Sequence, residues 1–474
     1  MTGSLAGLLL ANVLYLVVGI ALLPLLRIAR TRAELASRLG LAYILGLAAT
    51  GALAAHLALI GVPVGPLELF VLTLLVGVPA WRRGRRLPNH PSDTLSLGSN
   101  GVGLASRIVG IGCFLTALVL LAHAAHAYSV RPLLEWDGWA IWAMKARALY
   151  DFGGVAHGVF TTQPYGPLQH PLFLPALEAT GFRSMGAFDG TLIHVQLALL
   201  GFGFAAALWT MLRERVPEAL AGASILAIVA ADSTLRQLAA NLADIPLAFL
   251  VALGVVALAR TLLDENARLL PFAAVMLGAA TLTKPEGLLF AAAALVPFVL
   301  IARTRASLLT AAAVVLILLP WRVYAAIHGL KNPEYSLGDA LNPSVLADRS
   351  ERVRPAFEGV WHQVWSSGWS WLVPLALVAF AAGLLARCWR LAGFAAAWAL
   401  LSFGGIVLVF WISVVPVELT LRWAAYRTVA SLVLGAAALA PLLAGEAWRH
   451  SALTSRVRRG SAAPQTGASE GANP

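Results

Sequence analysis

The chain is 474 residues long, and 59% of its residues are hydrophobic whereas only 12% are charged. Soluble proteins carry about 25% charged residues, so this composition excludes a disordered chain and a cytosolic globular enzyme. The formal net charge of +11 would indicate nucleic acid as a partner of a soluble protein. In a membrane protein the same excess is expected in cytoplasmic loops, so we predict a membrane protein with no nucleic-acid partner.

Apolar segments recur along the whole chain, and about thirteen of them are long enough, or nearly so, to cross a hydrocarbon core of about 30 Å. They predict an all-α polytopic membrane protein with spans at residues 5–26, 39–61, 64–81, 107–128, 189–212, 217–231, 244–262, 269–283, 286–302, 307–326, 369–386, 391–415 and 424–447. Arginine clusters follow alternate spans. The positive-inside rule therefore places the N-terminus outside and the C-terminus in the cytoplasm. Two large loops, 129–188 and 327–368, then lie on the outer face.

The first outer loop opens with a run rich in tryptophan and charge. Trp136, Trp139 and Trp142 are three residues apart, which predicts a stripe on a helix lying at the outer membrane surface. An interfacial anchor without chemistry is the simpler interpretation. The same run holds more charge than an anchor needs, in Glu135, Asp137, Lys145 and Arg147.

The same loop continues into a proline-punctuated segment, residues 165–175, which is typical of a loop that re-enters the membrane. Tyr165 and His170 lie in it. His170 is a candidate for contact with a phosphate or a sugar, and a solvated loop histidine is the alternative. Asp244, which precedes Ile245 and Pro246 at a predicted helix start, is either ordinary N-terminal capping chemistry or part of a site.

Two further groups lie at the outer ends of predicted spans. Lys284 and Glu286 flank Pro285, where they form either a polar hairpin or a functional ion pair at membrane depth. Arg422 and Arg427 lie at the outer start of the last span, on the side where arginine is disfavoured. Arginine binds phosphate bidentately and keeps its charge, so these two indicate a phosphate site, with snorkelling to lipid headgroups as the alternative.

Together, these motifs resemble those of the C-type glycosyltransferases (GT-C), in particular the bacterial branch related to protein mannosyltransferases and aminoarabinose transferases. The likeness covers roughly residues 107–445 and rests on the topology and on the order of the motifs at residues 135–137, 142–146, 170–175, 243–246, 283–287 and 320–322. Composition and topology predict that residues 1–106 hold N-terminal spans and a flexible cytoplasmic loop and that 449–474 are a basic, disordered tail. The resemblance implies that 107–448 form the catalytic membrane module.

The resemblance also implies an activity. Members of this superfamily transfer a monosaccharide with inversion from a polyprenyl-phosphate donor, here to a glycan, lipid or protein acceptor on the outer face of the bacterial inner membrane. The matching general base is Asp137, and the donor phosphate would meet Lys145, Arg147, Lys284, Arg422 and Arg427. The other residues of the pocket would be Glu135, Trp142, Tyr165, His170, Asp244 and Glu286. Some members use a divalent metal such as Mg or Mn, although no spacing here demands one. The alternatives are a transporter or lipid flippase without transferase activity, and a non-catalytic scaffold.

Overall fold

The protein is described by a computed structural model that covers residues 2–88, 103–162 and 168–461. These residues form helices and connecting loops, with no β-strand among them. Eight helices are long and apolar enough to cross a membrane, or up to ten if each of two bent helix pairs is one span. The predicted all-α polytopic membrane protein is therefore confirmed.

Every predicted span coincides with a helix, but the count of 13 spans is not confirmed. The helices that meet the length and apolarity of a span include α1 (Thr2–Leu25), α3 (Ala42–Leu59), α5 (Leu104–Ser129), α8 (Ile193–Arg213), α11 (Asp244–Asp264), α14 (Arg305–Ile327), α19 (Trp389–Ile412) and α22 (Ala430–Ser461). The remaining predicted spans coincide with helices that do not meet these criteria on their own. They are α4 (Pro66–Arg85), which ends in arginines, the shorter α12 (Leu270–Thr281) and α13 (Glu286–Ala302), and α9 (Glu218–Ala230) and α18 (Leu372–Leu385), which belong to the bent pairs.

Helix α11 lies at the centre of the fold, with 94% of its apolar window buried, and it packs against α8, α12 and α22. In contrast, only 17% of the window of α5 is buried, so most of that helix faces lipid. Close helix contacts are made through small residues. This is expected in a bilayer, where helices associate through close packing because the surrounding lipid is as apolar as their side chains. A Cβ on Gly110 of α5 would lie 2.3 Å from a backbone oxygen of α9.

The segment predicted to be the first outer loop contains the helix predicted there. A π-helical turn (Gly138–Ala143) leads into α6 (Met144–Phe152), and α7 (Phe173–Met185) packs against α6, α1 and α3. The predicted tryptophan stripe is wrong in one respect. Trp136 and Trp139 are half exposed, whereas Trp142 is buried, because the wider π-helical turn does not keep the register that an α-helix would give to a three-residue spacing.

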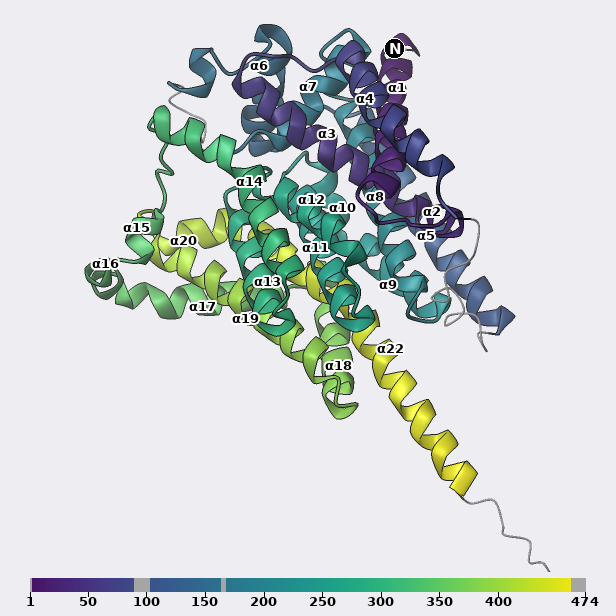
Figure 1. Ribbon diagram of the computed structural model, residues 1–474. Coiled ribbons are helices and arrows are strands. Elements are labelled where there is room, and N and C mark those ends of the chain that lie inside the picture. The colour runs from purple at the N-terminus through teal and green to yellow at the C-terminus, as the bar shows by residue number, and fades with distance from the viewer. Residues whose placement is uncertain (1, 89–102, 163–167, 462–474) are drawn as a thin grey trace, which may run out of the picture.

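Further short helices lie between the longer ones. They are α10 (Asp232–Ala239), which is bent by 56° from α9, and α15 (Leu337–Ala340), α16 (Pro343–Asp348), α17 (Val353–Val364), α20 (Val417–Thr420) and α21 (Tyr426–Thr428). The C-terminal part of α22 (yellow in Figure 1) projects from the side of the body opposite α15 and α16. Towards the predicted cytoplasmic ends of the spans, Arg260 pairs with Glu214 and Asp264, both at 2.8 Å.

Candidate functional site

An ion pair joins two segments that are 290 residues apart in the chain: Arg427 donates from Nη1 to Oδ2 of Asp137. Asp137 immediately precedes the π-helical turn, and Arg427 lies in α21. The two side chains are 27% and 13% exposed, respectively. The pair is thus largely withdrawn from solvent while the carboxylate keeps some access to it.

The connection between α10 and α11 holds both of these segments in place. Asn241 donates from Nδ2 to the Gly138 carbonyl at 3.2 Å, and Gln237 donates to the Tyr426 carbonyl at 3.3 Å. A Cβ on Gly138 would lie 2.4 Å from the carbonyl oxygen of Ala240. The residue after Asp137 must therefore be glycine for the two backbones to approach this closely.

A second ion pair lies at the start of α11. Lys284 Nζ donates to Asp244 Oδ1 at 2.8 Å and lies 3.8 Å from Glu286 Oε1. Asp244 and Lys284 are 3% and 8% exposed, and a buried charge is stable only when it is paired. Arg427 also acts electrostatically on Asp244, so the two ion pairs form one group. Of the two interpretations of Lys284 and Glu286, the structure favours the ion pair.

A third cation, Lys145, approaches from α6. Its Nζ donates to the His170 carbonyl at 3.1 Å, and the ring of Trp142 lies 5.2 Å from that of His170. Burial lowers the pKa of Lys145 to about 7. Burial, followed by the charges of Lys145, Lys284 and Arg427, lowers the pKa of His170 well below its usual value. A neutral histidine therefore lies where three cations converge.

Other predicted residues lie apart from this group. Arg147 pairs with Asp151 on its own helix at 3.5 Å and is 62% exposed. Arg422 and Glu135 are exposed. Tyr165 lies outside the described residues, so the structure does not place it.

Two carboxyl groups near the site carried no motif that singled them out. The pKa of Glu334, in the second outer loop, is raised by partial burial of its carboxyl group and then by Glu286, while Lys284 and Arg427 act in the opposite direction. Burial raises the pKa of Glu178 in α7 to about 8. The signal for Glu178 was an acidic residue within an apolar helix, which is costly without a role. No sequence signal indicated that Glu334 lies near the site, and its position can be recognised only from the three-dimensional structure.

The carboxylates of the site are held by cations and not by one another. Among the described residues, no group of three or more His, Cys, Asp or Glu side chains is placed to hold a metal ion. This donor set does not fit a divalent metal as arranged, and no step below is routed through one. Use of Mg or Mn stays a prediction, which turnover with and without a chelator would test.

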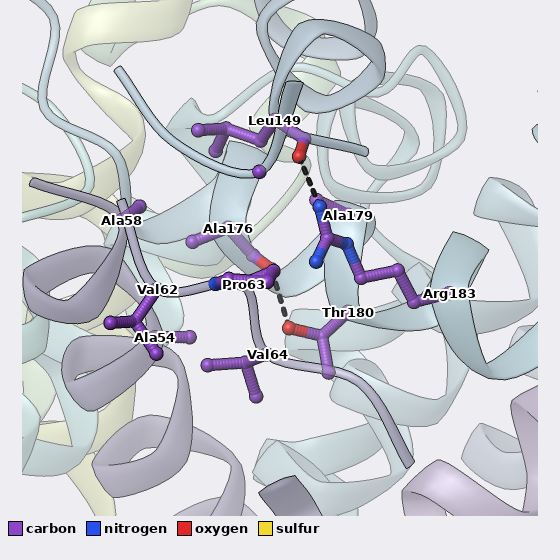
Figure 2. A pocket seen from close by; sticks show the side chains of 11 residues that line it. Ala54, Ala58, Val62, Pro63, Val64, Leu149, Ala176, Ala179, Thr180 and Arg183 are labelled. Atoms are coloured by element: carbon purple, nitrogen blue, oxygen red, sulfur yellow. Dashed lines mark hydrogen bonds between the residues drawn. The ribbon is translucent and has the colours of Figure 1, made fainter. Parts of the chain in front are cut away.

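Two small pockets are present, and this group of charges lines neither of them. Figure 2 shows the first, between residues 62–64, α3, α6 and α7, where Arg183 donates to the Leu149 carbonyl. The second lies between α5, α8 and α10 and is lined by His194.

The fold defines a polytopic membrane protein, and comparison with known families gives its class. Residues 169–324, about a third of the chain, match the family described as dolichyl-phosphate-mannose-protein mannosyltransferase. This match supports the predicted assignment to the GT-C superfamily and indicates a membrane glycosyltransferase of the GT-C type. The matched range contains Asp244 and Lys284, whereas Asp137 and Arg427 lie outside it. No match is found among curated proteins or solved structures.

Proposed function

We propose that the protein transfers a monosaccharide, with inversion, from a polyprenyl-phosphate donor to a hydroxyl group of a glycan, lipid or protein. The proposed place is the outer face of the bacterial inner membrane, with the N-terminus outside and the C-terminus in the cytoplasm. The observation that carries the proposal is the pairing of Asp137 with Arg427 beside the Lys284–Asp244 pair. The matched family's name includes a lipid-phosphate sugar, which supports this class of donor.

Asp137 is the proposed general base. Its carboxylate accepts the proton of the acceptor hydroxyl as that oxygen attacks the anomeric carbon. The new bond to the acceptor oxygen forms while the bond from the anomeric carbon to the phosphate oxygen breaks. Attack from the face opposite the phosphate inverts the anomeric centre. The products are the glycosylated acceptor and polyprenyl phosphate, and the proton is on Asp137.

The cations are proposed to stabilise the leaving phosphate, on which negative charge develops in the transition state. Arg427 suits this role because guanidinium binds phosphate bidentately. In the structure its guanidinium is hydrogen-bonded to Asp137. A donor phosphate that takes over this hydrogen bond would release the carboxylate to act as a base. Lys145 and Lys284 add positive charge around neutral His170, whose ring can bond a sugar hydroxyl.

The test is incubation of the purified protein, in liposomes, with a panel of labelled polyprenyl-phosphate sugars and a membrane extract as the source of acceptors. We expect one donor to release polyprenyl phosphate and to label an acceptor. Movement of intact donor across the bilayer without cleavage would instead support a flippase. If neither cleavage nor labelling occurs with any donor of the panel, the proposed function is wrong.

A further inference from the structure

Helix α4 carries exposed apolar side chains along its whole length. They recur every three or four residues, so they form a stripe on one face of the helix. The members of the stripe are 45–68% exposed, and they are Leu67, Phe70, Val71, Leu74, Leu75, Val78 and Trp81. An exposed apolar surface of this extent on a polytopic membrane protein marks a contact with the bilayer. Helix α4, which also packs against α1, therefore borders lipid.

The stripe on α4 ends in arginine. Arg82 and Arg85 follow Val78 and Trp81 at a spacing of four residues, so they continue the same face by one turn. Both are exposed, and the guanidinium of Arg85 lies over the Trp81 ring, 4.0 Å from its centroid. Tryptophan is enriched at the level of lipid headgroups. A lipid whose chains lie along α4 thus meets guanidinium groups at the height of its own headgroup.

A second set of arginines reaches the same place from the end of α1. The N–H of Arg32 donates to the Pro88 carbonyl at 3.3 Å, which joins the segment after α1 to the segment after α4. The two segments form what we call the arginine cluster: Arg27, Arg30, Arg32, Arg82, Arg83, Arg85 and Arg86, all exposed except the half-buried Arg83. The partial negative charges of two helix C-termini offset only about one of its positive charges.

Among the described residues, no carboxylate pairs with any arginine of the cluster. Glu34, the closest acidic residue in sequence, is buried, forms an ion pair with Arg268 and accepts from the Arg30 backbone N–H at 2.7 Å. In contrast, Arg260, at the end of another span, pairs with Asp264. The positive-inside rule explains why arginine follows a span. It does not explain why arginines of two spans are brought together without a carboxylate.

We propose that the arginine cluster binds the phosphate of an anionic phospholipid whose chains lie along the exposed stripe of α4. Guanidinium groups bind phosphate oxygens bidentately, and arginine keeps its charge. A zwitterionic lipid brings a cation of its own, which the cluster repels, so the site selects for headgroup charge. The inference is independent of the proposed function, because no residue of the cluster belongs to the site described above.

The experiment titrates the purified full-length protein in detergent with phosphatidylglycerol or phosphatidylcholine and counts bound lipid by native mass spectrometry. We expect phosphatidylglycerol to bind at least about tenfold more tightly. An arginine beside an anionic lipid is worth about fivefold in affinity. Arg82→Gln/Arg85→Gln and Arg30→Gln/Arg32→Gln should therefore each weaken phosphatidylglycerol binding by about 25-fold.

Two controls separate a built site from general positive charge. Arg303→Gln/Arg305→Gln removes two exposed arginines at the junction of α13 and α14, and it should stay within about twofold of the wild type. Arg82→Lys/Arg85→Lys keeps the charge and should bind phosphatidylglycerol more tightly than the glutamine pair. Inorganic phosphate at the concentration of the lipid should not displace phosphatidylglycerol, because it lacks the chains that contact α4.

A second measurement replaces no arginine. Brominated acyl chains quench indole fluorescence on contact, and the contribution of Trp81 is the difference between the wild type and Trp81→Phe. In nanodiscs of equimolar phosphatidylglycerol and phosphatidylcholine, Trp81 should be quenched more strongly when the bromine is on phosphatidylglycerol. The inference is overturned if the two brominated lipids quench Trp81 equally, if the Arg303/Arg305 control loses as much affinity as the cluster variants, or if inorganic phosphate displaces the lipid.

Discussion

Lys145 should make donor use depend on pH near neutrality. The side chain is 1% exposed, and burial lowers its pKa from 10.5 to about 7. At about 1.4 kcal/mol per unit of pKa, burial disfavours the charged form by about 5 kcal/mol. In the proposed function, the donor phosphate would supply a partner for this charge.

The direction of the effect follows from the form that is charged. In the protein without donor, Lys145 is charged in about 90% of molecules at pH 6 and in about 10% at pH 8. Because only the charged amine attracts phosphate, kcat/KM for the donor should fall towards tenfold per unit as pH rises above 7. A bound phosphate stabilises the ammonium group, so kcat at saturating donor should fall less.

The assay is the pH profile of kcat/KM between pH 5.5 and 8.5 for the wild type, Lys145→Met and the control Lys331→Met. Lys331 is exposed in the second outer loop, so its variant should keep the wild-type profile. Lys145→Met should lose activity at pH 6 and converge with the wild type near pH 8.5. A flat wild-type profile, or the same fall retained in Lys145→Met, would refute the reasoning.

Three further substitutions test the rest of the site. Lys284→Met leaves Asp244 buried without its partner and should lower the free energy of unfolding by about 3–5 kcal/mol, as measured by thermal unfolding. Adding Asp244→Asn should restore part of that loss, and no recovery would contradict the pairing. Gly138→Ala forces two backbones apart and should cost about 1–3 kcal/mol in stability as well as activity, whereas Gly77→Ala, where a Cβ meets nothing within 4 Å, should be tolerated. Arg427→Gln should lower kcat by about 10²–10³ in a donor-cleavage assay, and wild-type kcat in this variant would exclude Arg427 from phosphate stabilisation.

The spans were predictable because each is a local property of composition. All the predicted segments are helical. The count of 13 spans is not confirmed, because α12 and α13 are apolar but shorter than the length that a span requires. The buried position of Trp142 was not predictable. A three-residue spacing defines a stripe only on an α-helix, and no pattern in the sequence predicts that this turn is π-helical.

The sequence predicted which residues belong to the site, but it did not predict which of them are in contact with one another. Asp137, Lys284 and Arg427 stood out because charges are sparse in this chain, yet no local pattern pairs residues 290 positions apart. Conversely, Arg147 has the same chemistry as Arg427 but finds a partner one helical turn away. Glu178 shows no motif beyond an acidic residue within an apolar helix, and only the fold shows that its carboxyl group is buried.

The central claim, that Asp137 is the general base of sugar transfer, is tested most directly by donor cleavage in Asp137→Asn. Asp151→Asn, which removes an exposed carboxylate from the same loop, is the matched control. Asp137→Asn should lose about 10²–10⁴ in kcat while binding the donor at least as tightly, because Arg427 is then free for the phosphate. Asp151→Asn should keep wild-type turnover. Undiminished turnover in Asp137→Asn would contradict the claim.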